Sequence, residues 1–467
     1  MAQPAEKVQI IHMYEARPEI YPREIKGKYA TLRWVFVWLT QVVFYGLPWL
    51  NWNDRQAVLF DLGARKFHIF GLVLWPQDFI YLAILLIICA YALFLFTAVF
   101  GRVWCGFSCP QTVYTEIFMW VERKIEGTRS ERMRLDRQPL SLQKIAKKGA
   151  KHLAWGAIAL WTGFTFVGFF SPIRELGGSV LSLGLGPWEW FWILFYGFAT
   201  YGNAGWLREQ VCKYMCPYAR FQSSMFDKDT LIVTYDAVRG EPRGARAKSK
   251  ADAASRLGDC IDCSMCVQVC PTGIDIRNGL QYDCISCGAC IDACNTVMDK
   301  VGSPRGLIRF ATDNALRNKF SVRDIVRRAL RARVLIYSAI LILIVTAFAG
   351  SLYTRSPLKM DVIRDRGSMG REVEDGMIEN VYRLQIMNTA ERAQRLQLTV
   401  SGIDTIRIDT ATQIEVPHAT THSVPVRVRV EGGQGERGSN EIVFELKSLD
   451  QDGLRVEEDA VFIVPRR

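Results

Sequence analysis

Eight cysteines near the middle of the chain occur in two runs with the same spacing, C-x2-C-x2-C-x3-C. Pro271 follows the first run, whereas Asn295 stands where proline is usual after the second. The spacing is typical of chains that bind two [4Fe-4S] clusters, in which the fourth Cys of each run reaches the other cluster. Zinc ribbons also use C-x2-C pairs, but two tandem four-Cys runs are more specific than a zinc site requires. We therefore predict one cluster on Cys260, Cys263, Cys266 and Cys294, and a second on Cys270, Cys284, Cys287 and Cys290.

The segment between the two runs, residues 272–283, is short. It leaves little room for a substrate pocket. We therefore expect a compact α+β module of the bacterial two-cluster ferredoxin type at about 255–300, which passes single electrons. The chemistry that these electrons drive must lie elsewhere in the chain.

Two further cysteine pairs share the motif C-x3-C-P. They are Cys105 and Cys109 before Pro110, and Cys212 and Cys216 before Pro217. Because the motif recurs after the second and fourth of the apolar segments described below, it indicates an internal duplication of two helical hairpins. Proline suits the first turn of a helix, so Cys109 and Cys216 are expected at helix N-termini, where a thiolate is stabilised.

These pairs are candidate copper ligands. Cysteines four residues apart lie on one face of a helix, about 6 Å apart at Cβ, and thiolates together with the thioether of Met215 select Cu(I). We predict that Cys105, Cys109, Cys212 and Cys216 form this catalytic metal site, as one centre or as two. Inert packing is the alternative, and it is our interpretation of Cys89. A disulfide is disfavoured in a reducing compartment.

Five apolar segments are long enough, or nearly so, to cross a bilayer, which needs about 20 helical residues. They run over residues 34–52, 79–100, 153–170, 190–207 and 334–354. The predicted architecture is therefore a five-helix transmembrane bundle. It divides into an N-terminal segment 1–33, four helices within 34–207, a segment 208–333 with the ferredoxin module, a fifth helix 334–354 and an exported domain 355–467.

Basic residues predict the sidedness. Eleven Lys or Arg lie in the loop 101–151, and more precede the first and fifth segments, whereas residues 171–189 hold only Arg174. Positive loops face the cytoplasm, so the N-terminus and the ferredoxin module are expected there and the C-terminal domain outside. We expect these basic residues to be solvated loop residues that set orientation, with no nucleic-acid partner.

The exported domain is expected to be an all-β, immunoglobulin-like sandwich. Short alternating runs at 382–387, 396–400, 405–408, 413–416, 424–430, 442–446 and 461–464 are separated by turn residues. This region has no Cys to form a disulfide, so its hydrophobic core alone must stabilise the domain. His418 and His422 could bind copper or zinc, but in a strand they lie far apart, which favours ordinary surface residues.

Composition agrees with a membrane protein that has two polar compartments. The chain has 467 residues, 49% of them hydrophobic, and a net charge of +11. Its mean hydropathy of +0.06 averages very apolar and very polar stretches. These values exclude a disordered or collagen-like chain, and the absence of Cys after Cys294 keeps all thiols on the reducing side.

Taken together, these features resemble the CcoG (RdxA/FixG) family of accessory proteins for assembly of cbb3-type cytochrome oxidase. Matching text includes residues 122–136, 212–227 and 380–390. The resemblance covers nearly the whole chain, and the tail separates it from NapH-like proteins that share the C-x3-C-P hairpins. It implies a membrane-bound polyferredoxin of the bacterial inner membrane that reduces Cu(II) to Cu(I) for the oxidase. The implied partners are the lipid bilayer, copper ions, a copper chaperone or transporter and oxidase assembly factors.

Two other functions are kept open. One is a quinol-linked electron-transfer protein of the NapH-like kind, in which the paired cysteines contact a quinone or a partner. The other is a non-enzymatic assembly scaffold with structural clusters. The electron donor is left open, and an exported sandwich beside a single span allows a homodimer.

Overall fold

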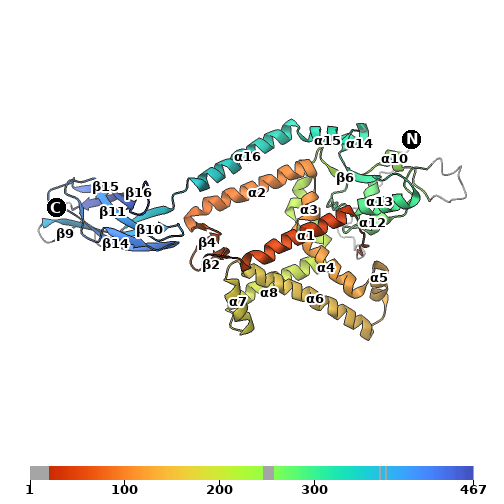
Figure 1. Ribbon diagram of the computed structural model, residues 1–467, viewed down its shortest axis with the longest axis horizontal. Helices are drawn as coiled ribbons and strands as arrows, with labels where there is room; N and C mark the ends of the chain where they lie inside the picture. The colour runs from red at the N-terminus through yellow and green to blue at the C-terminus, as the bar shows by residue number, and fades with distance from the viewer. Residues whose placement is uncertain are drawn as a thin grey trace, which may run out of the picture. The chain divides into compact units, whose positions relative to one another are not determined.

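The computed structural model describes residues 20–245, 257–318, 320–365, 367, 370–373 and 376–465 (Figure 1). Most of the predicted N-terminal segment, as far as Glu19, and the first residues of the predicted ferredoxin module lie outside these ranges. The chain forms two compact units. The first comprises Met1–Gly46, Cys89–Val167 and Ser179–Leu341, and the second comprises Leu47–Ile88, Gly168–Gly178 and Ile342–Arg467.

Within the described residues, three helical segments are long and apolar enough to cross a membrane: Lys28–Trp49, Pro76–Phe100 and Ala332–Tyr353. They contain helices α1 (Lys28–Gly46), α2 (Phe79–Phe100) and α16 (Ala332–Tyr353). Their outward-facing side chains are apolar, as Ile80 on α2 and Leu343 on α16 show. Such surfaces suit lipid rather than water, so the chain is a membrane protein.

The other two predicted spans, residues 153–170 and 190–207, lie in helices whose apolar part is too short to count as a membrane span. The first turns of α6 (Leu142–Val167) carry Lys144, Lys147, Lys148 and Lys151. Helix α8 (Pro187–Tyr201) has 15 residues before the chain continues as the π-helical segment η3 (Gly202–Leu207). Because a straight span needs about 20 apolar residues, the count of five spans and the sidedness stay predictions.

Unit 1 also contains short helices around the cysteines, shown in Figure 1. They are α3 (Val103–Phe107), α4 (Pro110–Glu126), α5 (Arg129–Arg137), the π-helical η4 (Val211–Met215), α9 (Pro217–Phe221), η5 (Gln222–Met225) and α10 (Ala237–Gly240), and, near α16, α14 (Asp313–Asn318) and α15 (Val322–Ala329). Helices α6 and α8 pack closely because Gly163 and Gly197 carry no side chains. A Cβ on Gly163 would lie 2.2 Å from the carbonyl oxygen of Ile193.

The predicted α+β module is present in unit 1. It consists of α12 (Met265–Gln268), η6 (Ile276–Asn278), α13 (Ala289–Val301) and an antiparallel pair of strands, β6 (Ile232–Tyr235) and β7 (Ile308–Ala311). Its core combines cysteines with Val233, Ile291 and Met298. Helix α13 begins at the second cysteine run, so the fold of the module depends on the same segment that carries the thiols.

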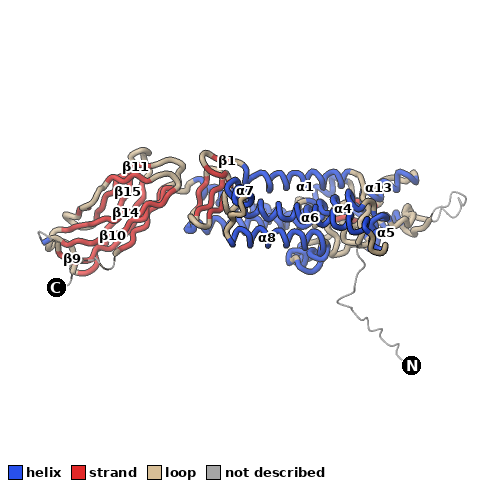
Figure 2. Tube along the Cα trace, turned by 90° about the horizontal axis from the view of Figure 1, so that it is seen from below, coloured by secondary structure: helices blue, strands red, loops and turns tan. Residues whose placement is uncertain are grey.

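Unit 2 contains the predicted sandwich, whose strands are red in Figure 2. One sheet has the order β12-β14-β10-β8, with β9 also paired to β10, and the other has the order β13-β11-β15-β16. The strands are β8 (Leu358–Arg364), β9 (Arg371–Glu372), β10 (Ile378–Asn388), β11 (Gln394–Ser401), β12 (Arg407–Ile408), β13 (Gln413–Val416), β14 (Thr420–Val430), β15 (Gly438–Ser448) and β16 (Arg455–Val464). Leu384, Val428 and Phe444 are fully buried in one core. Strands β8 and β9 are additional to the runs predicted from sequence.

Unit 2 also holds small elements that the sequence did not predict. Between α1 and α2 the chain forms η1 (Leu47–Trp49), β1 (Asn51–Trp52), β2 (Arg55–Gln56), β3 (Val58–Asp61), β4 (Lys66–Ile69), β5 (Leu72–Leu74) and η2 (Pro76–Asp78). Helix α7 (Ile173–Leu181) follows α6. Buried Gln56 donates to the carbonyl of Gly168 at 2.7 Å and accepts from the amide of Ile173 at 3.0 Å, which joins the two connections.

Candidate iron-sulfur and thiol centres

The two cysteine runs of the module have left-handed backbone conformations at equivalent positions. Asp262 and Ser264 in the first run have φ angles of 53° and 55°, and Ser286 and Gly288 at equivalent places in the second have 54° and 74°. Left-handed residues that alternate with right-handed ones turn successive amide groups toward one side of a loop, which makes an anion-binding concavity. Each run therefore forms a loop suited to a negatively charged iron-sulfur cluster.

The structure brings the first predicted ligand set together. Cys260, Cys263, Cys266 and Cys294 line one cavity of about 20 Å³. Burial, together with the neighbouring thiols Cys266, Cys260 and Cys263, raises the pKa of Cys294 to about 12. Burial likewise raises the pKa of Cys266 to about 11, while Arg277 opposes the shift. Four converging thiols beside one cation fit the ligand set of a [4Fe-4S] cluster.

The thiols of the second predicted set also lie near one another, and all four are buried or partly buried. Burial raises the pKa of Cys290, and the nearby charges of Cys287, Cys284 and Cys270 also raise it. Burial raises the pKa of Cys284 to about 12, again with Cys287 and Cys270 as neighbours. Cys270 lies near the run Cys284–Cys290, and these four thiols fit the ligand set of a [4Fe-4S] cluster.

The C-x3-C-P motifs have matching local structures. Cys109 is the N-cap of α4 with Pro110 as its first residue, and Cys216 is the N-cap of α9 with Pro217 as its first residue. Cys105 lies in α3, which ends at Phe107, and Cys212 lies in the π-helical η4. The prediction that each pair shares one α-helical face is therefore wrong, because a break in the α-helix separates the partners. Short π-helical turns are frequent at functional sites.

The four thiols of these motifs lie near one another. Burial raises the pKa of Cys212 to about 12, and the charges of Cys109, Cys105 and Cys216 add to the shift. Burial also raises the pKa of Cys105 to about 11, although the side chain of Gln222 donates a hydrogen bond from Nε2 to its sulfur at 3.1 Å. We call these four neighbouring thiols, Cys105, Cys109, Cys212 and Cys216, the four-thiol centre.

The four-thiol centre lies against the second ferredoxin set. A Cβ on Gly106 would lie 2.6 Å from the carbonyl oxygen of Ile285 and 2.8 Å from the Cα of Cys287, so only glycine allows this approach. Cys105 packs on the buried cluster that contains Cys287. On the other side, Lys213 donates to the carbonyl of Thr272 at 3.0 Å. Both C-x3-C-P segments are thus held on the loops that carry the second set.

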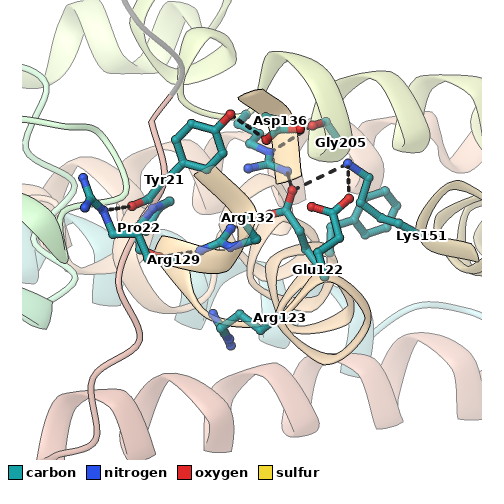
Figure 3. A network of polar contacts seen from close by, with 12 residues as sticks. Tyr21, Pro22, Glu122, Arg123, Arg129, Arg132, Asp136, Lys151 and Gly205 are labelled. Atoms are coloured by element: carbon teal, nitrogen blue, oxygen red, sulfur yellow. Dashed lines mark hydrogen bonds and ion pairs between the residues drawn. The ribbon is translucent and has the colours of Figure 1, made fainter. Parts of the chain in front are cut away.

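A buried ion network links helix α4 to α5, α6 and the segment before the second C-x3-C-P motif (Figure 3). Glu122 on α4 pairs with Arg132 at 2.8 Å, Arg208 at 3.1 Å and Lys151 at 3.8 Å. Lys151 also pairs with Glu126 at 3.1 Å. The expectation that basic residues of 101–151 are solvated is wrong for Arg132 and Lys151, because acidic residues on α4 neutralise them inside the fold.

The structure does not enclose the other candidate metal ligands together with the four thiols. Met215 is 58% exposed, whereas the four thiols are partly buried, so the structure does not enclose its thioether with them. Cys89 is exposed on α2, and its interpretation as a packed core residue is wrong. His418 and His422 are exposed, which agrees with ordinary surface residues.

Among the described residues, no three or more His, Cys, Asp or Glu side chains come close enough to hold one metal ion. The two ferredoxin sets are no exception, because the thiolates of a [4Fe-4S] cluster would each bind a different iron atom.

These features define a class: an iron-sulfur electron-transfer oxidoreductase with membrane helices. Comparison with known families agrees. Residues 207–313 match a 4Fe-4S dicluster domain, residues 82–127 match a 4Fe-4S binding domain, and residues 348–465 match the IG-like fold at the C-terminal end of FixG. The second match includes Cys105 and Cys109.

The chain belongs to the FixG/RdxA/RdxB family. It is 39% identical to the nitrogen fixation protein FixG of Rhizobium meliloti, over 84% of this chain and 80% of that protein. It is 38% identical to RdxB of Cereibacter sphaeroides, over 97% and 98% of the two chains, and 37% identical to RdxA of the same organism, over 94% and 95%. A crystal structure of a FixG-related protein from Vibrio parahaemolyticus matches 24% of this chain and 98% of its own, at 24% identity and a TM-score of 0.22.

Proposed function

We propose that the chain reduces Cu(II) to Cu(I) at the four-thiol centre, with single electrons from the ferredoxin module. The two ferredoxin sets would each hold a [4Fe-4S] cluster, which supplies a one-electron carrier. Cu(II) needs one electron, and the product Cu(I) is the ion that soft thiolates prefer. The observation that carries the proposal is the contact of Gly106 with the backbone of Ile285 and Cys287, which joins the two kinds of thiol centre.

The residues around the four-thiol centre suit a transient metal substrate. The thiols are partly buried and their raised pKa values keep them protonated until a metal displaces the protons. The amides of Gln111 and Thr112 donate to Cys109, which would stabilise its thiolate form. Copper binding would have to draw the thiols together, because they are not yet arranged around one ion.

The resemblance to the CcoG family supports a proposal for the biological setting. We propose that the protein lies in the bacterial inner membrane with its ferredoxin module in the cytoplasm and its sandwich in the periplasm. It would supply Cu(I), through a copper chaperone or transporter, during assembly of a cbb3-type oxidase. The basic loops support this orientation, and the sandwich would provide the surface for these partners or for a second copy of the chain.

A second candidate for the four-thiol centre is a third iron-sulfur cluster. The match of residues 82–127 to a 4Fe-4S binding domain favours it, since this range holds only Cys89, Cys105 and Cys109 among the cysteines. The protein would then be a three-cluster electron carrier whose acceptor binds elsewhere.

One experiment separates the candidates. The full-length protein is purified anaerobically, and iron, sulfide and bound copper are counted for the wild type and for a variant with Cys105, Cys109, Cys212 and Cys216 all changed to Ser. Cys89→Ser is the matched control. The copper proposal expects about eight irons in each protein, with copper binding and cupric reduction lost only in the fourfold variant. Undiminished copper reduction in that variant would sink the proposal, and a loss of about four irons would establish the third cluster.

A further inference from the structure

A second site lies in unit 1, away from the cysteines, in a groove along helix α1. The groove encloses a cavity of about 650 Å³ between α1, α4 and α6. It is lined by Trp34, Val37, Trp38, Gln41, Tyr45, Ile117, Trp120, Ala157, Ile158 and Trp161. Residues 34, 37, 38, 41 and 45 follow helical spacing, so they form one face of α1. This face extends over about 16 Å of helix axis.

Aromatic rings form both ends of this cavity. Trp34 meets Trp120 edge to face with ring centroids 6.4 Å apart, and Tyr45 meets Trp161 with centroids 6.5 Å apart. Trp38 is 66% exposed on the outer surface of α1, which is long and apolar enough to span a membrane. An apolar ligand can therefore enter from the lipid side, and flat rings in the walls favour a flat ring in the ligand.

One polar atom of a residue that lines the cavity has no hydrogen-bond partner. The Oε1 atom of Gln41 is buried without a hydrogen bond, although the side-chain amide of Gln41 also forms a hydrogen bond with the hydroxyl of Tyr114. The hydroxyl of Tyr45 lies 2.8 Å from that of Thr162 and 3.4 Å from that of Tyr114. A buried carbonyl oxygen without a donor costs free energy, so the site favours a ligand that brings an O–H group. A plain acyl chain has none.

A polar cavity continues from the apolar one toward the thiols. Trp34 lines both cavities. The second, of about 390 Å³, is lined by Arg33, Glu116 and Arg123, and it reaches Pro271 and Ala289. The last two residues are the sequence neighbours of Cys270 and Cys290 in the second ferredoxin set. A ligand in the apolar cavity would therefore lie on a path to the redox module.

We propose that the cavity along α1 binds a lipophilic quinone and its hydroquinone. The aromatic walls would hold the ring, the open side would admit the apolar tail, and Gln41 would provide an acceptor for the hydroquinone O–H or a donor for the quinone carbonyl. The inference that this ligand is the electron donor rests on the proposed function. In that role both O–H bonds of the hydroquinone break, two electrons leave, one for each ferredoxin set, and two protons pass to water in the polar cavity.

Binding is tested on the copper-free, full-length protein in detergent, by titrating decylubiquinone and following quenching of Trp fluorescence. Four Trp residues line the cavity, so we expect saturable quenching. Gln41→Leu keeps a side chain of similar size but removes the amide that would form hydrogen bonds, so it should weaken binding about five- to tenfold. Gln143→Leu, on the exposed N-terminal part of α6, is the matched control and should bind as the wild type does.

Trp38→Leu changes an exposed residue in the wall of the cavity and should therefore fold normally. It tests the proposal independently if Gln41→Leu folds poorly. It should reduce quenching and affinity while iron content stays unchanged. Quenching without saturation, or equal affinity in wild type, Gln41→Leu and Trp38→Leu, would show a lipid-filled groove and overturn the proposal. Because quinone binding is measured without copper, its result does not depend on whether the protein reduces copper.

Discussion

Arg208 donates a hydrogen bond from Nη2 to Oε1 of Glu122 at 3.1 Å. The contact joins the segment before the second C-x3-C-P motif to the helix that follows the first. Gln111, two residues after Cys109, adds a second connection, because its Nε2 donates to the carbonyl oxygens of Asn203 and Arg208 at 2.8 Å and 3.0 Å. The relative position of the two cysteine pairs therefore depends on polar side chains that themselves bind no metal.

Changing Glu122 to Gln should destabilise unit 1 strongly. The variant leaves Arg132, Arg208 and Lys151 without their shared carboxylate, and removal of one partner from a buried ion pair costs about 3–5 kcal/mol. We expect a clear fall in the midpoint of thermal unfolding, measured in detergent, together with weaker copper or iron retention at the four-thiol centre. Glu24→Gln, at an exposed position, should unfold like the wild type. An unchanged midpoint for Glu122→Gln would contradict a structural role for the network.

The same carboxylate predicts how stability depends on pH. Burial alone would raise the pKa of Glu122, but Arg208 and Arg132 outweigh it and hold the pKa below the ordinary value of 4.5. A lowered folded-state pKa contributes stability above the unfolded value, and the contribution is lost as the pH falls through the folded value. The midpoint of the wild type should therefore fall below about pH 4.5. The profile of Glu122→Gln should be flatter there, and parallel profiles would refute the assignment.

Gly106→Ala should separate the four-thiol centre from the second ferredoxin set. The new Cβ would collide with the carbonyl oxygen of Ile285 and the Cα of Cys287, which are backbone atoms that cannot turn aside. Overpacking of this kind costs about 1–3 kcal/mol. We expect lower thermal stability and slower cupric reduction with both clusters retained, as judged by EPR of the reduced protein. Gly149→Ala on α6 meets no atom within 4 Å and serves as the control; it should be neutral or slightly stabilising.

In unit 2, Asp78→Asn should loosen the start of the sandwich. Asp78 is 3% exposed and accepts from Arg355 at 2.5 Å and from Lys359 at 2.7 Å. The neutral amide would leave two cations poorly paired, at a cost of about 3–5 kcal/mol. Hydrogen exchange should become faster in β8, where Lys359 lies. Asp54→Asn changes a side chain that is 76% exposed and should leave exchange unchanged; equal rates in both variants would show that the buried pairing does not hold β8.

The spacing of the cysteines determined much of the ferredoxin module before any fold was known. Ligand sets of this kind depend on short loops, so local sequence predicts that Cys294 joins Cys260–Cys266 and that Cys270 joins Cys284–Cys290. The alternation of apolar residues likewise predicted most strands of the sandwich, since side chains in a strand alternate between two faces. Strand β8 also alternates, with Leu358 and Met360 buried and the charged residues Lys359 and Asp361 between and after them, but it was not among the predicted runs.

Other features were decided only by the tertiary structure. Burial of Arg132 and Lys151 is possible because Glu122 and Glu126 come from a different helix, and such neutralisation is invisible in a window of neighbouring residues. Residues 122–136 contain both acidic and basic residues, which indicates that ion pairs can form there. The sequence does not show which acidic residue pairs with which basic one. The convergence of Cys105 and Cys109 with Cys212 and Cys216, more than 100 residues away, and the approach of Gly106 to Cys287 depend on long-range packing. Spacing along the chain determines which thiols form a local loop, whereas only the packing of the helices determines which loops meet.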